Sequence, residues 1–404
     1  MTANRMFRYL IAAVALWTAL GCGPKAPPDY PTWAEDSPPV TLDSSRAFDM
    51  YRSAALEAEQ KGAKYLTRVS YFPGQKLAAA KLVEEPFKKV IRATASKAEF
   101  DFRPHRPFET LEYHKGWRLL GRVFAWKVED AAKQKDFGTA VQLANTGTKF
   151  AFDLTAGGAM DASLGYGIAD DIRRALAPYL DEMEQPHLSA LSTGISAALQ
   201  RLAPPDRVVQ NEKQNMLMAT QSVQDAFQKS DWKDYEEKMG SSGKDAGEAL
   251  HNLARENNTE RIDFFQSMAT EVDRIITYNL AIAALPTEER RSQKAPEFKR
   301  SRDWRVFSQH FFETLPPVLA MRDATVARTK LLILTSRLLA NRKEGFPSDL
   351  PKGSLETDPF SGRPFIYHYD AAQFSLYSVG PNLRDDGGET DETFSKPDLV
   401  LEQR

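Results

Sequence analysis

Histidine is the side chain best suited to bind a metal ion or to carry a proton at neutral pH, and this chain has six. None of them belongs to an HExxH pattern or to another metal-binding spacing. His114 and His310 lie in helical patterns beside aromatic residues, which is typical of structural histidines. The histidines therefore predict no metal-dependent chemistry.

The segment Gly-Ser-Ser-Gly-Lys at 240–244 contains the residue types of two catalytic motifs. A phosphate-binding loop needs a preceding strand and a longer glycine spacing, whereas a helical pattern precedes this segment. Ser241 and Lys244 have the SxxK spacing of acyl-transfer enzymes, but no partner motifs follow. We interpret 240–244 as a linker and assign no catalytic residue, so the chain is expected not to be an enzyme.

Two further features lie inside helical patterns. Gly165 and Gly167 interrupt a good helix, where each glycine costs up to about 1 kcal/mol, and we attribute them to close helix packing rather than to ligand binding. Glu212 shares an apolar stripe with Val209 and Met216. A buried carboxylate there needs a partner, or its pKa rises. The alternative for Glu212 is an exposed position at the edge of the stripe.

The elements that must position these residues are mostly helices. From Ser45 to residue 342, apolar residues recur at intervals of three and four, the period of amphipathic helices. We expect about eleven helices, at 47–60, 75–94, 111–134, 139–154, 160–183, 187–202, 205–239, 246–255, 259–285, 296–315 and 317–342. The predicted fold class is mostly α, with stacked antiparallel helical hairpins in an all-α domain at 45–320 and a small α+β module with a β-hairpin at 321–404.

One pair of these helices, at 111–154, weakly resembles a tetratricopeptide hairpin. The resemblance rests on Trp117, Leu120, Gly121 and Phe124 in the first helix and on Asp136, Phe137 and Ala140 after the turn. The interval from Trp117 to Ala140 is too long, and no repeat of roughly 34 residues recurs along the chain. We therefore expect a single helical hairpin.

The N-terminus has the pattern of an export signal. Arg5 and Arg8 precede an apolar run from Tyr9 to Leu20, which is too short to span a bilayer. The following Ala19-Leu20-Gly21-Cys22 resembles the lipobox of bacterial lipoproteins. That resemblance implies a signal peptide at 1–21, a lipid on Cys22, and, with Gly23 next, the outer membrane of a Gram-negative host. An ordinary signal peptide and an uncleaved anchor are the alternatives.

Residues 22–44 contain six prolines and no helical period, so we expect an extended tether. Cys22 is the single cysteine of the chain, so the fold contains no internal disulfide. The mature chain has a net charge of −4 with well-mixed signs, which disfavours a nucleic-acid partner.

The last 77 or so residues carry a more specific pattern. A helix is followed by Gly345-Phe346-Pro347, by Asp358-Pro359-Phe360-Ser361-Gly362, and by the strand-like runs Phe365–Tyr369 and Phe374–Val379. This series resembles the globular half of type II secretion pseudopilins. The prepilin cleavage site and assembly helix of that family are missing here, so the resemblance implies a fold and not a pilus.

In major pseudopilins the loop after this hairpin binds calcium. The resemblance implies a calcium site at Asn382, Asp385, Asp386 and Asp391, with Glu389 nearby, since calcium takes six to eight oxygen ligands. The alternative is a solvated acidic loop, and no other cofactor is expected.

These features together predict a lipid-anchored, exported protein of the bacterial cell envelope that binds other envelope proteins without catalysing a reaction. Two alternatives stay open, a subunit associated with a secretion machine or pseudopilus and an exported hydrolase with an unrecognised site. The hydrolase would require a polar pocket between helices that holds acids or histidines.

Overall fold

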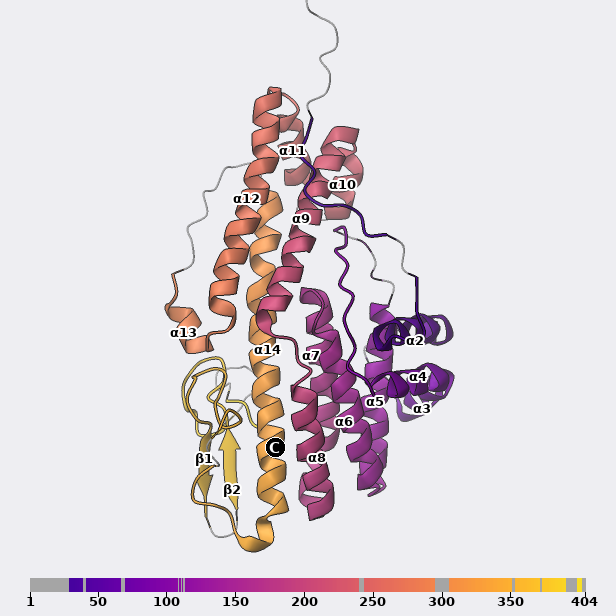
Figure 1. Ribbon diagram of the computed structural model, residues 1–404, viewed down its shortest axis with the longest axis vertical. Helices are drawn as coiled ribbons and strands as arrows, with labels where there is room; N and C mark the ends of the chain where they lie inside the picture. Colours follow the sequence, from indigo (N-terminus) through magenta and orange to yellow (C-terminus); the bar gives the residue numbers. More distant parts are fainter. Residues whose placement is uncertain are drawn as a thin grey trace, which may run out of the picture.

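The computed structural model describes residues 29–38, 41–66, 70–107, 109, 111, 113–239, 243–294, 305–350, 353–370, 373–389 and 398–401, without the side chains of 305–306 and 308–313. Signal residues 1–21, Cys22, His310, Ser241 and Asp391 or their side chains lie outside that part. The described chain is mostly helical, with thirteen α-helices and one two-stranded antiparallel sheet (Figure 1), so the predicted fold class is confirmed.

The helices follow in this order: α2 (Ala47–Gly62), α3 (Pro73–Leu82), α4 (Glu84–Ala93), α5 (His114–Lys133), α6 (Phe137–Leu154), α7 (Ala159–Leu176), α8 (Gln185–Leu199), α9 (Pro205–Lys229), α10 (Trp232–Met239), α11 (Gly243–Leu253), α12 (Asn258–Ala283), α13 (Thr287–Ser292) and α14 (Arg305–Ala340). Among the described helices, none combines the length and the apolar character needed to cross a bilayer.

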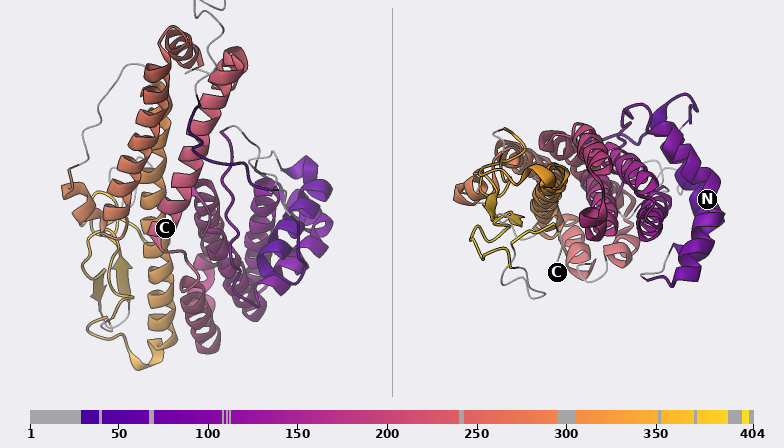
Figure 2. Two further views of the ribbon diagram at one scale, coloured as in Figure 1. Left: turned by 45° about the horizontal axis from the view of Figure 1, so that its top comes forward. Right: turned by 90° about the horizontal axis from the view of Figure 1, so that it is seen from below.

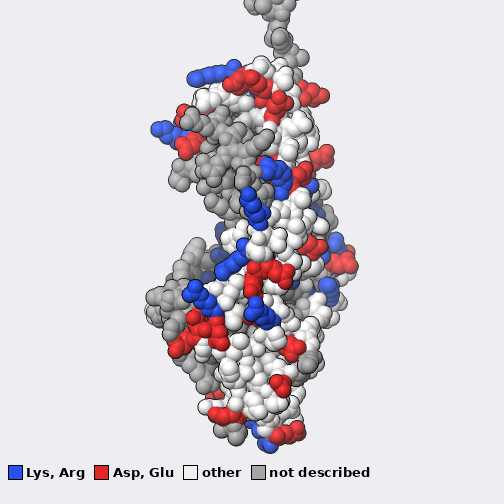
Figure 3. Space-filling view, turned by 90° about the vertical axis from the view of Figure 1, so that its left-hand side faces the viewer, with Lys and Arg blue, Asp and Glu red and all other residues white. Residues whose placement is uncertain are grey.

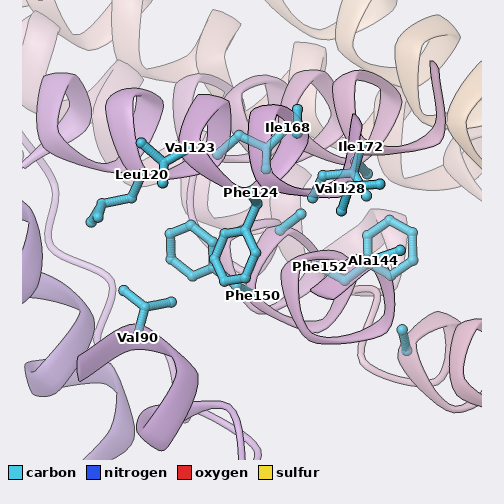
Figure 4. Close-up of a cluster of buried hydrophobic side chains, with 14 of the residues drawn as sticks. Val90, Leu120, Val123, Phe124, Val128, Ala144, Phe150, Phe152, Ile168 and Ile172 are labelled. Carbon is cyan, nitrogen blue, oxygen red and sulfur yellow. The ribbon is translucent and has the colours of Figure 1, made fainter. Parts of the chain in front are cut away.

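The centre of the body is the layer formed by α5, α6 and α7. The helical hairpin expected at 111–154 is present as α5 and α6, with Asp136 accepting a hydrogen bond from the backbone N–H of Thr139 at the start of α6. Figure 4 shows the core that this layer shares, in which Phe124 of α5 faces Phe150 of α6. Helices α2, α3 and α4 cover the outer side of α5 (Figure 2).

Two predicted helices are broken in the structure. The helix expected at 75–94 ends at Leu82 and restarts at Glu84, because Pro86 has no N–H to give to the carbonyl of Leu82. The helix expected at 205–239 ends at Lys229, where Ser230 adopts a left-handed conformation (φ 57°) and the N–H of Asp231 bonds back to the carbonyl of Ala226 at 2.9 Å.

The predicted break before Pro317 is wrong, because α14 is one helix of 36 residues that contains Pro316 and Pro317. Both prolines are exposed. Water can therefore satisfy the carbonyls one turn earlier that lose their N–H donors. The expected boundary between a helical domain and a C-terminal module at residue 320 thus lies inside a helix that both parts share.

The C-terminal module packs on the second half of α14. Strands β1 (Ile366–Tyr369) and β2 (Phe374–Tyr377) form the expected hairpin, with Ile366 opposite Tyr377 and Tyr369 opposite Phe374. Gly362 has the expected positive φ, at 69°. The side chains that bury this contact are Ala327, Leu331, Leu334 and Leu338 of α14 and Phe360, Phe365 and Leu376 of the module.

The module is also bonded to the helical body. The backbone N–H groups of Thr287 and Glu288, at the start of α13, donate to the carbonyls of Pro359 (3.2 Å) and Phe360 (2.9 Å). Arg173 of α7 donates to the carbonyl of Leu401. These contacts fix the module against α7, α13 and α14, and not against α14 alone.

Residues Tyr30 to Asp36, which we call the strap, lie in the expected extended tether and pack on the helical body. The Tyr30 ring meets Phe227 of α9 and Phe265 of α12 edge to face, at 6.3 and 5.9 Å between centroids. Trp33 donates through its backbone N–H to Gln221 and through its indole N–H to Gln224, both at 2.9 Å. The tether therefore packs along the end of the body that α9 and α12 form.

A buried ion pair holds α13 and α12 to the middle of α14. Asp323 of α14 is 1% exposed, and its carboxylate accepts two bonds from the guanidinium of Arg290, at 2.6 and 3.2 Å. Arg290 also donates to the carbonyls of Ile282 and Ala283 at the end of α12. Burial raises the pKa of the Asp323 carboxyl, and Arg290 opposes that shift.

We expect Arg290→Met to lower the free energy of unfolding by about 3 kcal/mol or more, because the buried charge of Asp323 keeps the hydrogen bond from the Thr287 hydroxyl but loses its ion-pair partner. Protonation of Asp323 removes that charge. Since its folded-state pKa is raised, the loss should shrink as the pH falls from neutral to mildly acidic. Denaturant unfolding at the two pH values measures both effects.

Arg363→Met is the matched control, because the pair of Arg363 with Glu288 is exposed. We expect it to change stability by less than about 0.5 kcal/mol. Equal losses in the two variants would mean that the buried pair does not hold the helices together.

Candidate functional site

The acidic loop follows β2 and is closed by residues 398–400. Ser378, just after β2, exchanges two backbone hydrogen bonds with Leu399, at 3.0 and 2.9 Å. Between these contacts the chain turns through Gly387 and Gly388, whose φ angles are 78° and 77°. Residues with a β-carbon rarely adopt such angles, so the two glycines allow the tight turn that the sequence predicted.

Three of the four predicted calcium ligands lie together in this loop. The amide of Asn382 donates to Asp386 at 2.7 Å, and Asp385 accepts from the Tyr377 hydroxyl (2.9 Å) and from the Gly387 N–H (3.0 Å). These side chains bind one another and the loop backbone. No group of three or more histidines, cysteines or acids in the described part is arranged to hold a metal ion, and Asp391 lies outside that part. The calcium site stays a prediction.

Asp398 is a member of this loop that the sequence analysis missed. Its Oδ2 accepts the N–H groups of Asp386 (2.9 Å) and Gly388 (2.8 Å), while its buried Oδ1 has no hydrogen-bond partner. Burial raises the pKa of this carboxyl, and the charges of Asp386 and Asp385 add to the rise. Asp398 thus adds a buried carboxylate oxygen without a hydrogen-bond partner to the loop, although the acids of the described part form no group that could hold a metal ion. Asp398 directly precedes an apolar run and lies ten and twelve residues after its partners Gly388 and Asp386, so no local pattern marks it as part of the loop.

We expect millimolar calcium to raise the melting temperature of the chain from residue 23 onward relative to chelator. Calcium that binds only the folded state adds about 2.7 kcal/mol at a hundredfold excess over its dissociation constant. Asp386→Ala should remove most of this difference, and magnesium should substitute poorly because it demands tighter octahedral geometry.

Asp349→Ala provides the control, since Asp349 is an exposed acid of the same module outside the loop. It should leave the calcium effect unchanged. Superimposable melting curves in calcium and in chelator would leave the loop as solvated charge.

A sizeable cleft lies elsewhere, between α5, α7 and α14. It has a volume of about 450 Å³. From α5 it receives His114, Arg118 and Arg122, which share one face because they are spaced by four residues. From α7 it receives an apolar strip with Leu164 and Ile168.

His114 stands at one end of the cleft and is bonded to α7. Its Nε2 lies 2.7 Å from Oδ1 of Asp161, whose Oδ2 accepts the N–H of Gly158 at 3.1 Å. Both oxygens of this aspartate are thus used to join α5 to the first turn of α7. Ser163 also lines the cleft but makes no hydrogen bond with His114 among the described contacts. The expected structural role of His114 agrees with this geometry.

Glu212 is buried, so the alternative of an exposed edge position is wrong. Its Oε2 accepts the N–H of Ala159, the first residue of α7, at 3.0 Å, and the Asn215 amide at 3.1 Å. A carboxylate is stabilised at a helix N-terminus, where unpaired N–H groups carry partial positive charge. The partner that Glu212 requires is therefore a helix end from another part of the chain.

The two glycines of α7 differ in their surroundings. At Gly165 an added Cβ would lie 2.4 Å from the carbonyl oxygen of Ala151, which confirms the predicted close packing. At Gly167, which lines the cleft, an added Cβ would meet nothing within 4 Å, so packing does not explain it.

The other motif candidate has no site geometry. In 240–244 the described residues Gly243 and Lys244 open α11, and the element before them is the helix α10 and not a strand. That arrangement does not fit a phosphate-binding loop.

Fold and sites together define a mostly α-helical protein with a small β-hairpin module, an acidic loop and a sizeable cleft between α5, α7 and α14. Comparison with known proteins finds no matching family model, no matching curated protein and no matching solved structure.

Proposed function

We propose that this chain is a lipid-anchored protein of the bacterial cell envelope that binds other molecules and catalyses no reaction. The observation that carries the proposal is the strap. Seven peptide units separate Cys22 from Asp29, and from Tyr30 the chain packs on α9 and α12. A lipid on Cys22 therefore keeps that end of the body within about 25 Å of the membrane.

A rigid body held at short range from a membrane suits a binding protein. An ion pair also holds the strap to the body. The guanidinium of Arg106 donates to both carboxylate oxygens of Asp36, at 2.7 and 3.0 Å, and to Asp225 of α9 at 2.8 Å. With the strap in place, the body cannot extend far from its anchor.

The C-terminal module offers a surface for a protein partner. In Figure 3, positive and negative side chains intermingle over the middle of one face, while the lower part, where the module lies, is mostly uncharged. Tyr367 and Tyr369 stack there, with centroids 5.9 Å apart and planes 9° apart, and Tyr369 is 47% exposed. Exposed aromatic residues are enriched in protein interfaces.

The two alternatives receive less support. A hydrolase would need an activated nucleophile, and Ser163 does not bond with His114 in the cleft. A secretion-associated subunit rests on the pseudopilin resemblance, and the position of the gene among secretion genes would favour it.

We expect wild-type protein in the membrane fraction, released by detergent, and Cys22→Ser either in the soluble fraction or as an unprocessed precursor. The cause is the loss of the thiol that receives the lipid, since the acyl chains supply the membrane affinity. Cell fractionation with immunoblotting measures the distribution.

A control moves the single thiol by combining Cys22→Ser with Ser37→Cys. This double variant should behave like Cys22→Ser, because a thiol outside the lipobox is not modified. If Cys22→Ser is processed and fractionates like wild type, the lipoprotein assignment is wrong.

For the binding surface, we expect Tyr369→Lys to abolish the capture of partner proteins that wild type retains from native membranes. A charge placed among stacked aromatic residues would have to lose its hydration in an interface. Met321→Lys, which changes an exposed apolar residue on α14, should retain capture. Capture that is equal in both variants would argue against the hairpin face.

A further inference from the structure

We propose that the cleft between α5, α7 and α14 binds a small anionic amphiphile, that is, a carboxylate or phosphate group on an apolar body. This site is separate from the lipid anchor, from the acidic loop and from the hairpin face. One wall of this cleft is positively charged, its floor is apolar, and it is lined by a glycine that packing does not require.

The α5 wall supplies positive charge that the protein does not neutralise. Of its three basic residues, His114 is bonded to Asp161 and Arg122 donates to the Tyr71 hydroxyl at 3.0 Å. Arg118 lies between them, is exposed, and makes no hydrogen bond or ion pair with any described residue. A guanidinium in this position is a strong donor to a carboxylate or phosphate.

Asp171, on the α7 wall of the cleft, makes no ion pair with Arg118 among the described residues, so it does not take the place of an anionic ligand. Asp171 of α7 lines the cleft and pairs with Arg174 at 3.3 Å. Burial raises the pKa of the Asp171 carboxyl, which Arg174 and Arg122 only partly oppose. The protein thus leaves Arg118 as the free charged donor of the cleft.

The floor between these walls is apolar. Leu164 and Ile168 of α7 and Val318 of α14 form it, and Met160 stands at the rim with 56% of its surface exposed. A methionine is flexible and polarizable, and it adapts to apolar ligands of different shape. A cleft of about 450 Å³ is within the usual range for small-molecule sites.

Gly167 gives the independent indication that the cleft is kept open. Glycine within a helix costs about 1 kcal/mol relative to alanine. At Gly121 and Gly165 close neighbours explain the glycine, since an added Cβ would lie 2.5 and 2.4 Å from other atoms. At Gly167 there is free space, so a side chain there would occupy the cleft and not the core.

The test is calorimetric titration of the chain from residue 23 onward, which removes only residues outside the described part and needs no detergent. The probes are dodecanoate and dodecyl phosphate below their micelle concentrations, with dodecanol and dodecyltrimethylammonium as the uncharged and cationic counterparts. We expect the anions to bind in one-to-one ratio and the counterparts to bind at least tenfold more weakly. The stronger of the two anions identifies the head group as carboxylate or phosphate.

Two variants locate the site. Arg118→Ala should weaken the binding of the anions at least tenfold while leaving that of dodecanol unchanged. Gly167→Leu should abolish all binding by filling the cleft, without lowering the melting temperature, because an added Cβ meets open space and leucine is the better helix former. Arg92→Ala, which removes an exposed arginine of α4, should bind like wild type.

Several outcomes would overturn the proposal. They are no binding of either anion, dodecanol binding as tightly as dodecanoate, and unchanged binding in Gly167→Leu. Each result is independent of membrane fractionation, so a failure here is distinguishable from a failure of the lipid-anchor proposal.

Discussion

The rest of the structure depends on covering one long helix. With 36 residues, α14 rises about 54 Å and carries apolar side chains along most of its length, and no single neighbour can bury it. Its first half is covered by α9 and α12, and its second half by α7 and α8 on one side and by the β-hairpin module on the other (Figures 1 and 2). The Arg290–Asp323 pair lies near the middle and sets where these two sets of neighbours meet. A helical body and a C-terminal module are therefore joined by shared packing, although they differ in composition.

The periodic features of the fold could be predicted from the sequence, and the exceptions have local causes. The intervals of three and four placed most helices, and the alternation of Phe365–Tyr369 with Phe374–Val379 placed the hairpin. Prolines account for two errors in the predicted helices, one break that was not expected and one expected break that is not present. Pro86 breaks a predicted helix at Val83, whereas Pro316 and Pro317 do not break α14, since their exposed positions allow water to take the freed carbonyls. Whether a proline ends a helix depends on its tertiary surroundings, which periodicity does not contain.

The candidate sites were less predictable, because they are assembled from residues far apart in the sequence. Asn382, Asp385 and Asp386 could be recognised as a local acidic loop, whereas Asp398 joins them only through the pairing of Ser378 with Leu399. The sequence marks Glu212 as a carboxylate on an apolar stripe that needs a partner. That partner, the N-terminus of α7, is 53 residues away in the sequence and could not be identified from it. The cleft had no signature at all apart from Gly167. Its basic wall is visible in the sequence as a spacing of four, but that spacing is common on solvated helices.

The strap and the contact at Leu401 also bear on the order in which the chain acquires its structure. The strap is synthesised among the first residues, yet its hydrogen-bond partners on α9 follow 188 to 193 residues later. Near the other end of the chain, the carbonyl that accepts from Arg173 belongs to Leu401, which is synthesised 228 residues later. While α2 to α8 are being made they can pack on one another, and α9 and α12 can pack together and on α14, but the face of α14 that carries Leu331, Leu334 and Leu338 stays uncovered until the module has emerged. Until then this apolar face of α14 is the part of the described core that is exposed to association with other chains.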